Sequence, residues 1–337
     1  WLLNTVPMPK TFANLSQRTQ VKHMRDYACA FLLRWGIQPD RLRLLNHGFN
    51  TAFSVEVGAE KYALRINVNS LHSEPEIWAE AEWLEHLRQR SDLFVPRVIK
   101  SRSGAEVEFQ DWDGGPRPLA AILFEWLEGP LLDERENVPA LRALGQATRK
   151  LHENALTVKF SPRASLKVLQ DCMVGESPEP IWETKAEKGL YIEVMDEANA
   201  VISRLAKDPV RPIHYDLHMS NLKWHKNRLS IFDFDDCLLG WPVLDPAVTM
   251  WYLRSCQDAA ELEAAYWEGL QEDPGSMGVS VREFEALVAA RSVLLAQAVV
   301  VATTPDLRAI MPRYIENTNK RLAHFQKTGT YVHKLDA

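Results

Sequence analysis

The interpretation of this chain depends most on the stretch Ile213-His214-Tyr215-Asp216-Leu217-His218-Met219-Ser220-Asn221. A second stretch follows it closely, Ile231-Phe232-Asp233-Phe234-Asp235-Asp236. In the first stretch, the D-x-x-x-x-N spacing predicts a short loop that turns back on itself. A carboxylate at the start of such a loop and an amide at its end then face the same cavity. In the second stretch, the apolar residues before Asp233 predict a short buried strand that holds its carboxylate rigidly.

The side chains of these two stretches suit phosphoryl transfer. That reaction needs one carboxylate at the acceptor hydroxyl and two oxygen ligands for Mg²⁺. Asp216 would serve at the hydroxyl, while the Asn221 carbonyl and the Asp233 carboxylate are ligands that a hard cation favours. Asp235 and Asp236 follow the strand, where acidic side chains either contact metal or substrate or are ordinary loop residues.

Composition sets wider limits on function. At 337 residues and 46% hydrophobic, the chain can form two domains with sizeable cores. Its net charge of −6 argues against a nucleic-acid binder that relies on a basic surface. The cysteines form no CxxC pair, so neither a zinc site nor a disulfide framework is expected. With no apolar run of membrane-spanning length, we expect a cytoplasmic protein that binds neither nucleic acid nor membrane, while its oligomeric state stays open.

The first third of the chain predicts a small lobe with an antiparallel sheet. Helical spacing of apolar residues predicts helices at 21–35 and 74–90, with Ser73 as the N-cap of the second. Strands are expected at 42–45, 51–57, 61–68, 95–100, 107–109 and 120–126. Strands, then one helix, then more strands describe an α+β lobe.

After Gly129 the pattern becomes helical almost throughout. Helices are expected at 138–152, 190–207, 259–271, 281–303 and 305–327, and an irregular segment at 161–187. We place the lobe boundary near residues 127–131. The chain then divides into an N-terminal lobe over residues 1–127 and a helical C-terminal lobe over residues 128–337.

The chain combines a strand-rich lobe, a helical lobe and the set of Asp216, Asn221 and Asp233. In this combination it resembles the aminoglycoside phosphotransferase and choline kinase-like family, which has a two-lobed protein-kinase-like fold. Nearly the full length fits this plan. The closest likeness is to bacterial kinases related to type II homoserine kinase and to the stress-response kinases, whose motifs resemble HGDLHxGN and IDFDD. Tyr215 stands where these kinases usually have Gly.

The resemblance implies an ATP- and Mg²⁺-dependent kinase. Asp216 would orient or deprotonate the acceptor hydroxyl, and Asn221 and Asp233 would hold Mg²⁺. The N-terminal lobe would bind the nucleotide, with the loop around Gly48 and Asn50 covering its phosphates. The C-terminal lobe would carry the catalytic loop and the substrate site.

The resemblance also assigns nucleotide contacts outside the phosphate loop. Arg65 takes the place of the family's third-strand Lys or Arg, which pairs with the phosphates and with a helix Glu, here Glu80. Its planar guanidinium allows a two-pronged contact. The alternative is a surface Arg and a solvated Glu. Residues 123–129 resemble the hinge that joins the lobes, where backbone groups near Glu125 and Leu127 would bind adenine.

His214 and His218 flank Asp216, and the three could be counted as zinc ligands. Their four-residue spacing belongs to a helix, whereas the pattern predicts a loop, so we favour other roles. His214 would hydrogen-bond backbone to brace the loop, and His218 would lie near the phosphates or the acceptor. Asp245 resembles the family's helix-starting Asp that ties down the catalytic loop, although a plain N-cap before Pro246 gives the same pattern.

The acceptor is expected to be a hydroxyl-bearing small molecule, such as an amino alcohol or a homoserine-like or aminoglycoside-like compound. The segment 161–196 is the expected substrate-specific insertion. Tryptophans of the helical lobe, Trp182 among them, could contact a cation, but large aromatic side chains usually fill cores. A protein Ser/Thr kinase of the stress-response type and a catalytically silent kinase-fold binding protein are the alternatives. The sequence does not distinguish ATP from GTP.

Overall fold

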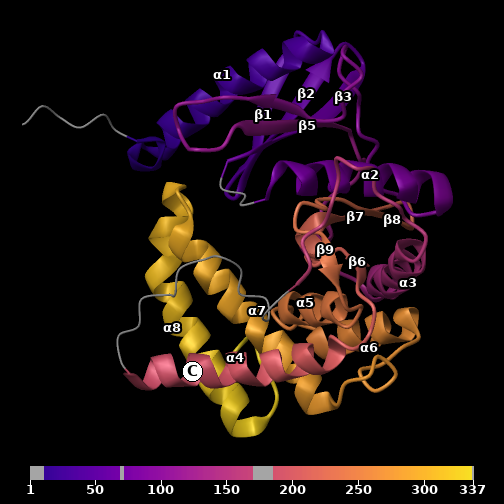
Figure 1. Cartoon of the computed structure of the whole chain (residues 1–337), viewed down its shortest axis with the longest axis vertical. Coiled ribbons are helices and arrows are strands. Elements are labelled where there is room, and N and C mark those ends of the chain that lie inside the picture. Colours follow the sequence, from indigo (N-terminus) through magenta and orange to yellow (C-terminus); the bar gives the residue numbers. More distant parts are fainter. Residues whose placement is uncertain (1–10, 69–71, 170–184, 336–337) are drawn as a thin grey trace, which may run out of the picture. The chain divides into compact units, whose positions relative to one another are not determined.

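The computed structural model of the chain describes residues 11–68, 72–169 and 185–335. The chain forms two compact units (Figure 1). The first consists of Trp1–Leu71, Val98–Trp126 and Val301–Met311, and the second of His72–Arg97, Leu127–Val300 and Pro312–Ala337. The chain passes from one unit to the other between residues 126 and 127, beside the expected boundary. By its contacts, however, the helix over 74–90 belongs to the second unit, so the contiguous division at residue 127 stays a prediction.

The first unit contains the expected antiparallel sheet. Its strands lie in the order β1 (Arg41–His47), β2 (Asn50–Val57), β3 (Glu60–Asn67), β5 (Leu119–Glu125) and β4 (Glu108–Gln110). The hairpin of β2 and β3 turns at Gly58, whose φ of 57° suits a glycine. The strand expected at 95–100 is wrong. Within that described segment Val98 makes only a single bridge to Phe124, because Pro96 lacks an N–H and only the end of β5 beyond β4 is open for pairing.

Helix α1 (Gln17–Trp35) covers this sheet with an apolar face. It begins after Ser16, whose side chain accepts a hydrogen bond from the Thr19 N–H, and ends at Gly36 with a left-handed φ of 74°. Its buried side chains, Met24, Ala28, Phe31 and Leu32, share one core with Phe53, Val55, Leu64 and Ile66 of the sheet. Burying each large apolar side chain contributes about 1.5–3 kcal/mol.

Residues from near the end of the chain complete the first unit. The side chain of Gln20 on α1 donates hydrogen bonds to the carbonyl oxygens of Phe12 (2.9 Å) and Thr303 (3.1 Å). Arg308 donates to the carbonyl oxygen of Ala13 (2.8 Å). The first unit is therefore assembled from three separate parts of the sequence.

The second unit is mostly helical, as expected. Its helices are α2 (Glu74–Arg90), α3 (Val138–Ala155), α4 (Lys185–Leu205), α5 (Leu244–Leu253), α6 (Ala259–Leu270), most of α7 (Val281–Val301) and the larger part of α8 (Pro305–Thr328). Two small antiparallel pairs lie among them: β6 (Arg211–Ile213) with β9 (Leu238–Gly240), and β7 (Leu222–His225) with β8 (Arg228–Ile231). At the start of α2, the Glu76 carboxylate accepts from the Ser73 N–H at 2.7 Å, which closes a capping box.

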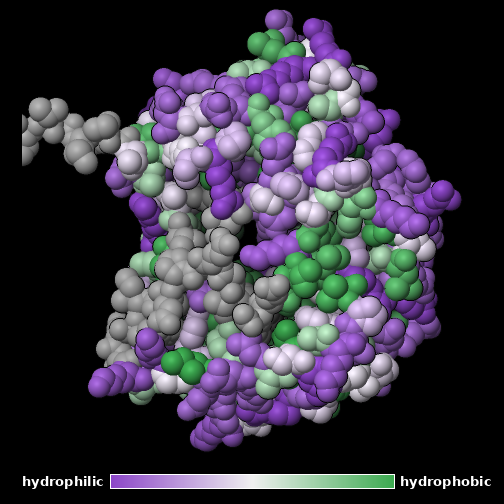
Figure 2. All heavy atoms as spheres, viewed as in Figure 1, coloured by the Kyte–Doolittle hydropathy of each residue, from purple (hydrophilic) through white to green (hydrophobic). Residues whose placement is uncertain are grey.

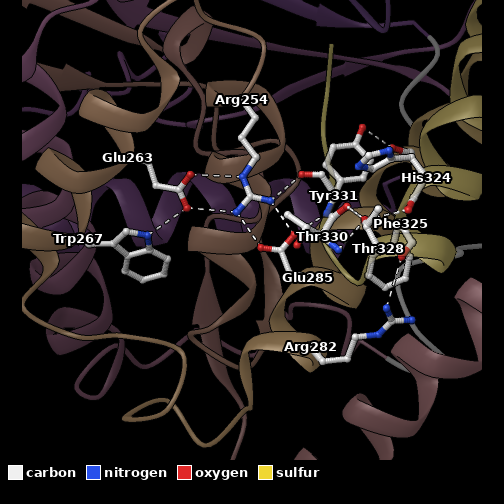
Figure 3. Close-up of polar contacts among 11 residues, drawn as sticks. Arg254, Glu263, Trp267, Arg282, Glu285, His324, Phe325, Thr328, Thr330 and Tyr331 are labelled. Atoms are coloured by element: carbon white, nitrogen blue, oxygen red, sulfur yellow. Dashed lines mark hydrogen bonds and ion pairs between the residues drawn. The ribbon is translucent and has the colours of Figure 1, made fainter. Parts of the chain in front are cut away.

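A partly buried ion-pair network ties three helices of the second unit to the segment after α8 (Figure 3). Arg254, at the end of α5, pairs with Glu263 of α6 (3.1 Å) and Glu285 of α7 (2.7 Å). It also donates to the Tyr331 carbonyl oxygen (3.0 Å), while the Tyr331 N–H donates to Glu285 (2.7 Å). Each buried charge thus has several partners, as burial in a low-dielectric interior requires.

The face of the molecule drawn in Figure 2 is mainly polar. In Figure 2, hydrophilic residues predominate on the face shown, and apolar ones gather over one area of the second unit. Among the described helices, none combines the length and the hydropathy that crossing a bilayer needs.

Helices α3 and α6 approach each other backbone to backbone at two glycines. A Cβ added at Gly145 would lie 2.0 Å from the Tyr266 carbonyl oxygen, and one at Gly269 would lie 2.0 Å from that of Arg142. Since backbone atoms of a packed helix cannot give way locally, any side chain at either position must separate the helices.

We therefore expect Gly145→Ala to lower the free energy of unfolding by about 1–3 kcal/mol or more. The matched control is Gly189→Ala on α4, where an added Cβ meets no atom within 4 Å. This change should be neutral or stabilise by up to about 1 kcal/mol, because alanine favours the helix. Thermal unfolding followed by circular dichroism measures both. Equal melting temperatures for the two variants would contradict the close-packing argument.

Candidate active site

The stretch 213–221 forms the expected loop, between β6 and β7. The loop ends in a short 3-10 turn at Met219–Asn221. The Asn221 side-chain amide donates to the Asp216 carboxylate (Oδ2, 2.8 Å) and to the Asp216 carbonyl oxygen (3.0 Å). The loop therefore turns back on itself, and its first carboxylate meets its last amide.

The strand before Asp233 lies against the end of this loop. β8 ends at Ile231, which is buried, and the Phe232 N–H donates to the Asn221 carbonyl oxygen at 3.0 Å. Asp233 follows in a left-handed conformation, with φ of 62°, and is half-buried. Such a conformation costs a non-glycine residue about 1–2 kcal/mol, which neighbouring contacts must offset. The backbone thus brings Asn221 and the residues leading to Asp233 together.

These residues are chemically suited to a hard cation. The Asn221 Nδ2 group is engaged with Asp216, which leaves the Asn221 Oδ1 atom as the ligand-type oxygen of that side chain. Asp233 adds a carboxylate close by in the chain, and oxygen ligands of this kind are those that Mg²⁺ and Ca²⁺ prefer. The residues present therefore fit a divalent cation.

Asp245 holds the backbone of the loop. Its side chain is fully buried in the first turn of α5, where the helix dipole favours a negative charge. One carboxylate oxygen accepts from the Tyr215 N–H (2.7 Å), and the other accepts from the His214 N–H (3.3 Å) and the His152 ring (2.9 Å). One turn along α5, Thr249 donates to the Leu217 carbonyl oxygen (2.8 Å). Helix α5 therefore fixes the loop backbone on both sides of Asp216.

Tyr215 adopts the left-handed conformation that its position requires. Its φ is 63°, in the region that glycine occupies freely, and its side chain is buried. Tyr215, at the position where the resembling kinases usually have Gly, thus forms a left-handed turn. The hydrogen bond from its N–H to Asp245 holds it there.

Asp216 lies among cationic and ring nitrogen groups. Arg291 Nη2 is 2.5 Å from one carboxylate oxygen, and His218 Nε2 is 3.3 Å from the other. Burial by itself would raise the pKa of Asp216, but the neighbouring His218 ring and the Arg291 guanidinium outweigh it, and the pKa lies below its ordinary value. Asp216 is therefore a carboxylate at neutral pH, able to accept a hydrogen bond from an acceptor hydroxyl.

The two loop histidines have different surroundings. Nδ1 of His214 accepts from the Asp216 N–H (3.3 Å), and burial lowers the pKa of His214, which keeps the ring neutral. His218 stacks on the Tyr252 ring with a centroid separation of 4.0 Å. Among the described residues, these histidines form no metal-ligating group with Asp216, which argues against the zinc alternative.

Asp235 lies in a different cluster from Asp216. With His72 and Asp236 it forms a group whose ligand atoms lie within 4.8 Å of one another, and His72 Nε2 is 3.2 Å from Asp236. His72 was not a sequence candidate, because its only local feature is its place before the N-cap of α2. Arg291 and Tyr252 were also missed. Neither lies near a motif in sequence.

The expected nucleotide-binding residues are distributed over both units. Gly48 and Asn50 flank the turn between β1 and β2, where the Gly48 N–H donates to the Asn50 carbonyl oxygen (3.0 Å). Arg65 on β3 is 6% exposed, with its guanidinium 5.5 Å from the centre of the Phe124 ring. Glu80, on α2 of the second unit, is 1% exposed. The alternative of a surface Arg and a solvated Glu is therefore wrong, although the pairing itself stays a prediction.

The remaining sequence candidates lie on either side of the point where the chain passes from one unit to the other, and in the helical unit. Glu125 ends β5 opposite Tyr62, and the Leu127 carbonyl oxygen accepts from the Lys223 ammonium (2.6 Å). Residues 170–184 of the expected insertion, with Trp182, lie outside the described residues. Among the other tryptophans, Trp83 and Trp251 are buried in the core.

Comparison with known proteins defines the class to which this fold and site belong. Residues 41–279 match the family described as "APH: Phosphotransferase enzyme family". Amicoumacin kinase of Bacillus subtilis (strain 168) is 27% identical over 275 residues, which cover 76% of this chain and 80% of that protein. The protein is therefore a kinase-like enzyme in fold and sequence. It belongs to the phosphotransferase enzyme family, which confirms the resemblance seen in its motifs.

Solved structures confirm the fold class. A microcompartment-associated aminopropanol kinase has a TM-score of 0.76 at 22% identity, covering 92% of this chain and 100% of that one. The amicoumacin kinase hAmiN, in complex with AMP-PNP, Ca²⁺ and Ami, has a TM-score of 0.72 at 18% identity, covering 93% and 98%. The two-lobed α+β kinase-like fold predicted from the sequence is thus correct.

The carboxylate of Asp245 provides a test of how the loop is held. We expect Asp245→Asn to lower the free energy of unfolding by about 3 kcal/mol, because its amide cannot accept from all the donors that now converge on the carboxylate. Turnover should fall as well, since the loop backbone around Asp216 loses its support. Asp258→Asn, at the exposed start of α6 and without a side-chain cap bond, is the matched control and should change neither property. A stable and fully active Asp245→Asn protein would contradict the assignment.

Proposed function

We propose that this phosphotransferase uses ATP and Mg²⁺ and moves the γ-phosphate to a hydroxyl group of a small molecule. The observation that carries the proposal is the convergence of Asp216, Asn221 and the chain leading to Asp233. An ionised carboxylate, an amide oxygen and a second carboxylate are the set that phosphoryl transfer needs. Transfer of this kind, from a nucleotide, fits a cytoplasmic enzyme.

Asp216 would receive the acceptor hydroxyl. Its carboxylate is ionised and its side chain is 16% exposed, so one hydroxyl can reach it while most of the surrounding solvent is excluded. The Asn221 amide, bound to Oδ2, helps to hold the carboxylate in one orientation. Orienting the hydroxyl for attack on the γ-phosphate is then its main contribution.

Asn221 and Asp233 would hold the cation. A bound Mg²⁺ supplies charge neutralisation on the phosphates. The chain's own contribution is to fix the two ligands: the Asn221 amide is oriented by Asp216, and its backbone carbonyl is tied to Phe232. His218 and Asp235 are candidates for further contacts with phosphate or cation.

The nucleotide would be bound mainly by residues of the first unit. The turn at Gly48 and Asn50 would cover the phosphates, and the buried Arg65 would pair with them and with Glu80. Backbone groups near Glu125 and Leu127 would bind adenine. The burial of Arg65 supports a role in charge pairing for this residue, because a buried guanidinium requires charged partners.

Relatives favour a small-molecule acceptor over a protein. Amicoumacin kinase and aminopropanol kinase are named for small molecules, so an amino alcohol or an aminoglycoside-like compound is preferred to a protein Ser/Thr. A catalytically silent binding protein is disfavoured by the ionised Asp216 in contact with Asn221. The test is ATP consumption by the purified protein with amino alcohols, homoserine, aminoglycosides and generic protein acceptors.

Two substitutions separate the proposed roles. Asp216→Ala should lower transfer by at least about 10²-fold while leaving nucleotide binding within about twofold, since the hydroxyl loses its orienting group. Asp233→Ala should also remove Mg²⁺-dependent nucleotide binding. The control is Asp92→Ala, which removes an exposed carboxylate that pairs with Lys150 on the surface. Rates come from ADP formation and affinities from titration calorimetry. Transfer by Asp216→Ala at the wild-type rate would refute the assignment.

A further inference from the structure

Arg291, on α7, makes a contact that none of the proposed roles uses. Its side chain is 2% exposed, and Nη2 lies 2.5 Å from Oδ1 of Asp216, 75 residues earlier in the chain. Burying a guanidinium is costly unless a charged partner compensates. Asp216 is that partner, so a buried cation is in direct contact with the proposed catalytic carboxylate.

The contact completes the set of groups that hold the Asp216 carboxylate. Oδ1 is bound by Arg291, while Oδ2 is bound by the Asn221 amide (2.8 Å) and approached by His218 (3.3 Å). Rotation of the carboxylate about the Cβ–Cγ bond would break the Arg291 contact on Oδ1 and the Asn221 contact on Oδ2. Without Arg291, only the Oδ2 contacts would resist that rotation. Arg291 therefore determines the plane of the carboxylate.

Aromatic rings hold the guanidinium in turn. Its central carbon lies 5.5 Å from the centre of the Tyr215 ring and 5.8 Å from that of Tyr252. Both distances are within the range of a cation–π contact. The Tyr252 ring also stacks on His218. A glycine at position 215 would provide no ring here, so the departure from the usual family motif supplies part of the environment of Arg291.

Helix α7 is fixed beside Arg291 by bonds to α5 and to the segment after α8. The next residue, Ser292, accepts from the Trp251 ring N–H (2.6 Å) and donates to the Tyr331 hydroxyl (2.8 Å). Two turns earlier, Glu285 joins the Arg254 network (Figure 3). Because α5 also carries Asp245, the loop backbone and the Arg291 side chain are positioned by the same helix. Supporting contacts of this kind are what keep a catalytic group in one geometry.

A purely structural role is the competing explanation. In that explanation, the sole role of Arg291 is to neutralise a buried carboxylate. Its removal would then lower stability and leave the turnover of the folded protein unchanged. A role through Asp216 predicts a loss of kcat with little change in nucleotide affinity. The two explanations therefore differ in a measurable property.

We propose that Arg291 is a positioning residue for phosphoryl transfer, which acts by holding the Asp216 carboxylate in the orientation that receives the acceptor hydroxyl. The inference rests on the proposed function. It adds a residue from α7 to a site otherwise built from the loop and the strand before Asp233.

The first test compares Arg291→Met and Arg291→Lys with the wild type. For Arg291→Met we expect kcat to fall about 10²-fold, the scale of a misplaced catalytic group, with the nucleotide Kd changed less than about twofold. Arg291→Lys keeps the charge without the planar fork and should recover part of kcat. If Arg291→Met does not fold, the Arg291→Lys comparison stands alone, and an undiminished kcat in that variant would overturn the proposal.

A double substitution tests whether the effect passes through Asp216. In an Asp216→Asn background, adding Arg291→Lys should lower the residual rate less than about twofold, because the group it orients is already lost. If Arg291→Lys lowers the rate by the same factor in the Asp216→Asn background as in the wild type, the proposal is overturned. Arg282→Met is the matched control, since it removes a partly exposed arginine of α7 that pairs with Glu197, and it should leave kcat unchanged. Failure of the wild type to consume ATP with any acceptor would instead overturn the proposed function and this inference together.

Discussion

The buried carboxylate of Asp245 is the interaction on which the site depends. A charge at zero exposure is stable only when donors surround it, and here the donors are two backbone N–H groups of the loop and the His152 ring. Moving the loop would remove the two backbone donors from that buried charge, at a cost of about 1–3 kcal/mol or more. The left-handed backbone of Tyr215 is held by the same bond. Asp216 and its partners within the loop, Asn221 and His218, are arranged from this fixed backbone.

Local patterns in the sequence predicted most of the fold and the centre of the site. Loop 213–221 and the strand before Asp233 were found because spacing and an apolar run are visible over a few residues. The helices at 281–303 and 305–327 were correct within two residues for the same reason. The strand at 95–100 failed because strand pairing depends on which distant edge is open, and β5 offers only its last residues beyond β4.

Residues that join the site from distant segments could not be predicted in the same way. Arg291 and Ser292 interrupt an apolar run between Ala286 and Val293, and the charge at position 291 was the one available signal. Nothing in the sequence shows which carboxylate it meets, because that is decided by the packing of α7 against α5. His72 and Tyr252 reach the site region through the same kind of long-range packing. The motif thus specifies the chemistry, and the helices specify its surroundings.

The composition of the first unit bears on the order in which the chain can fold during synthesis. Its sheet and α1 are made early, yet Gln20 and Ala13 bond to Thr303 and Arg308. Those bonds cannot form until residues 303 and 308 have left the ribosome, although domains made first generally fold first. The first unit therefore completes its contacts only after residues 127–300 of the second unit have been made.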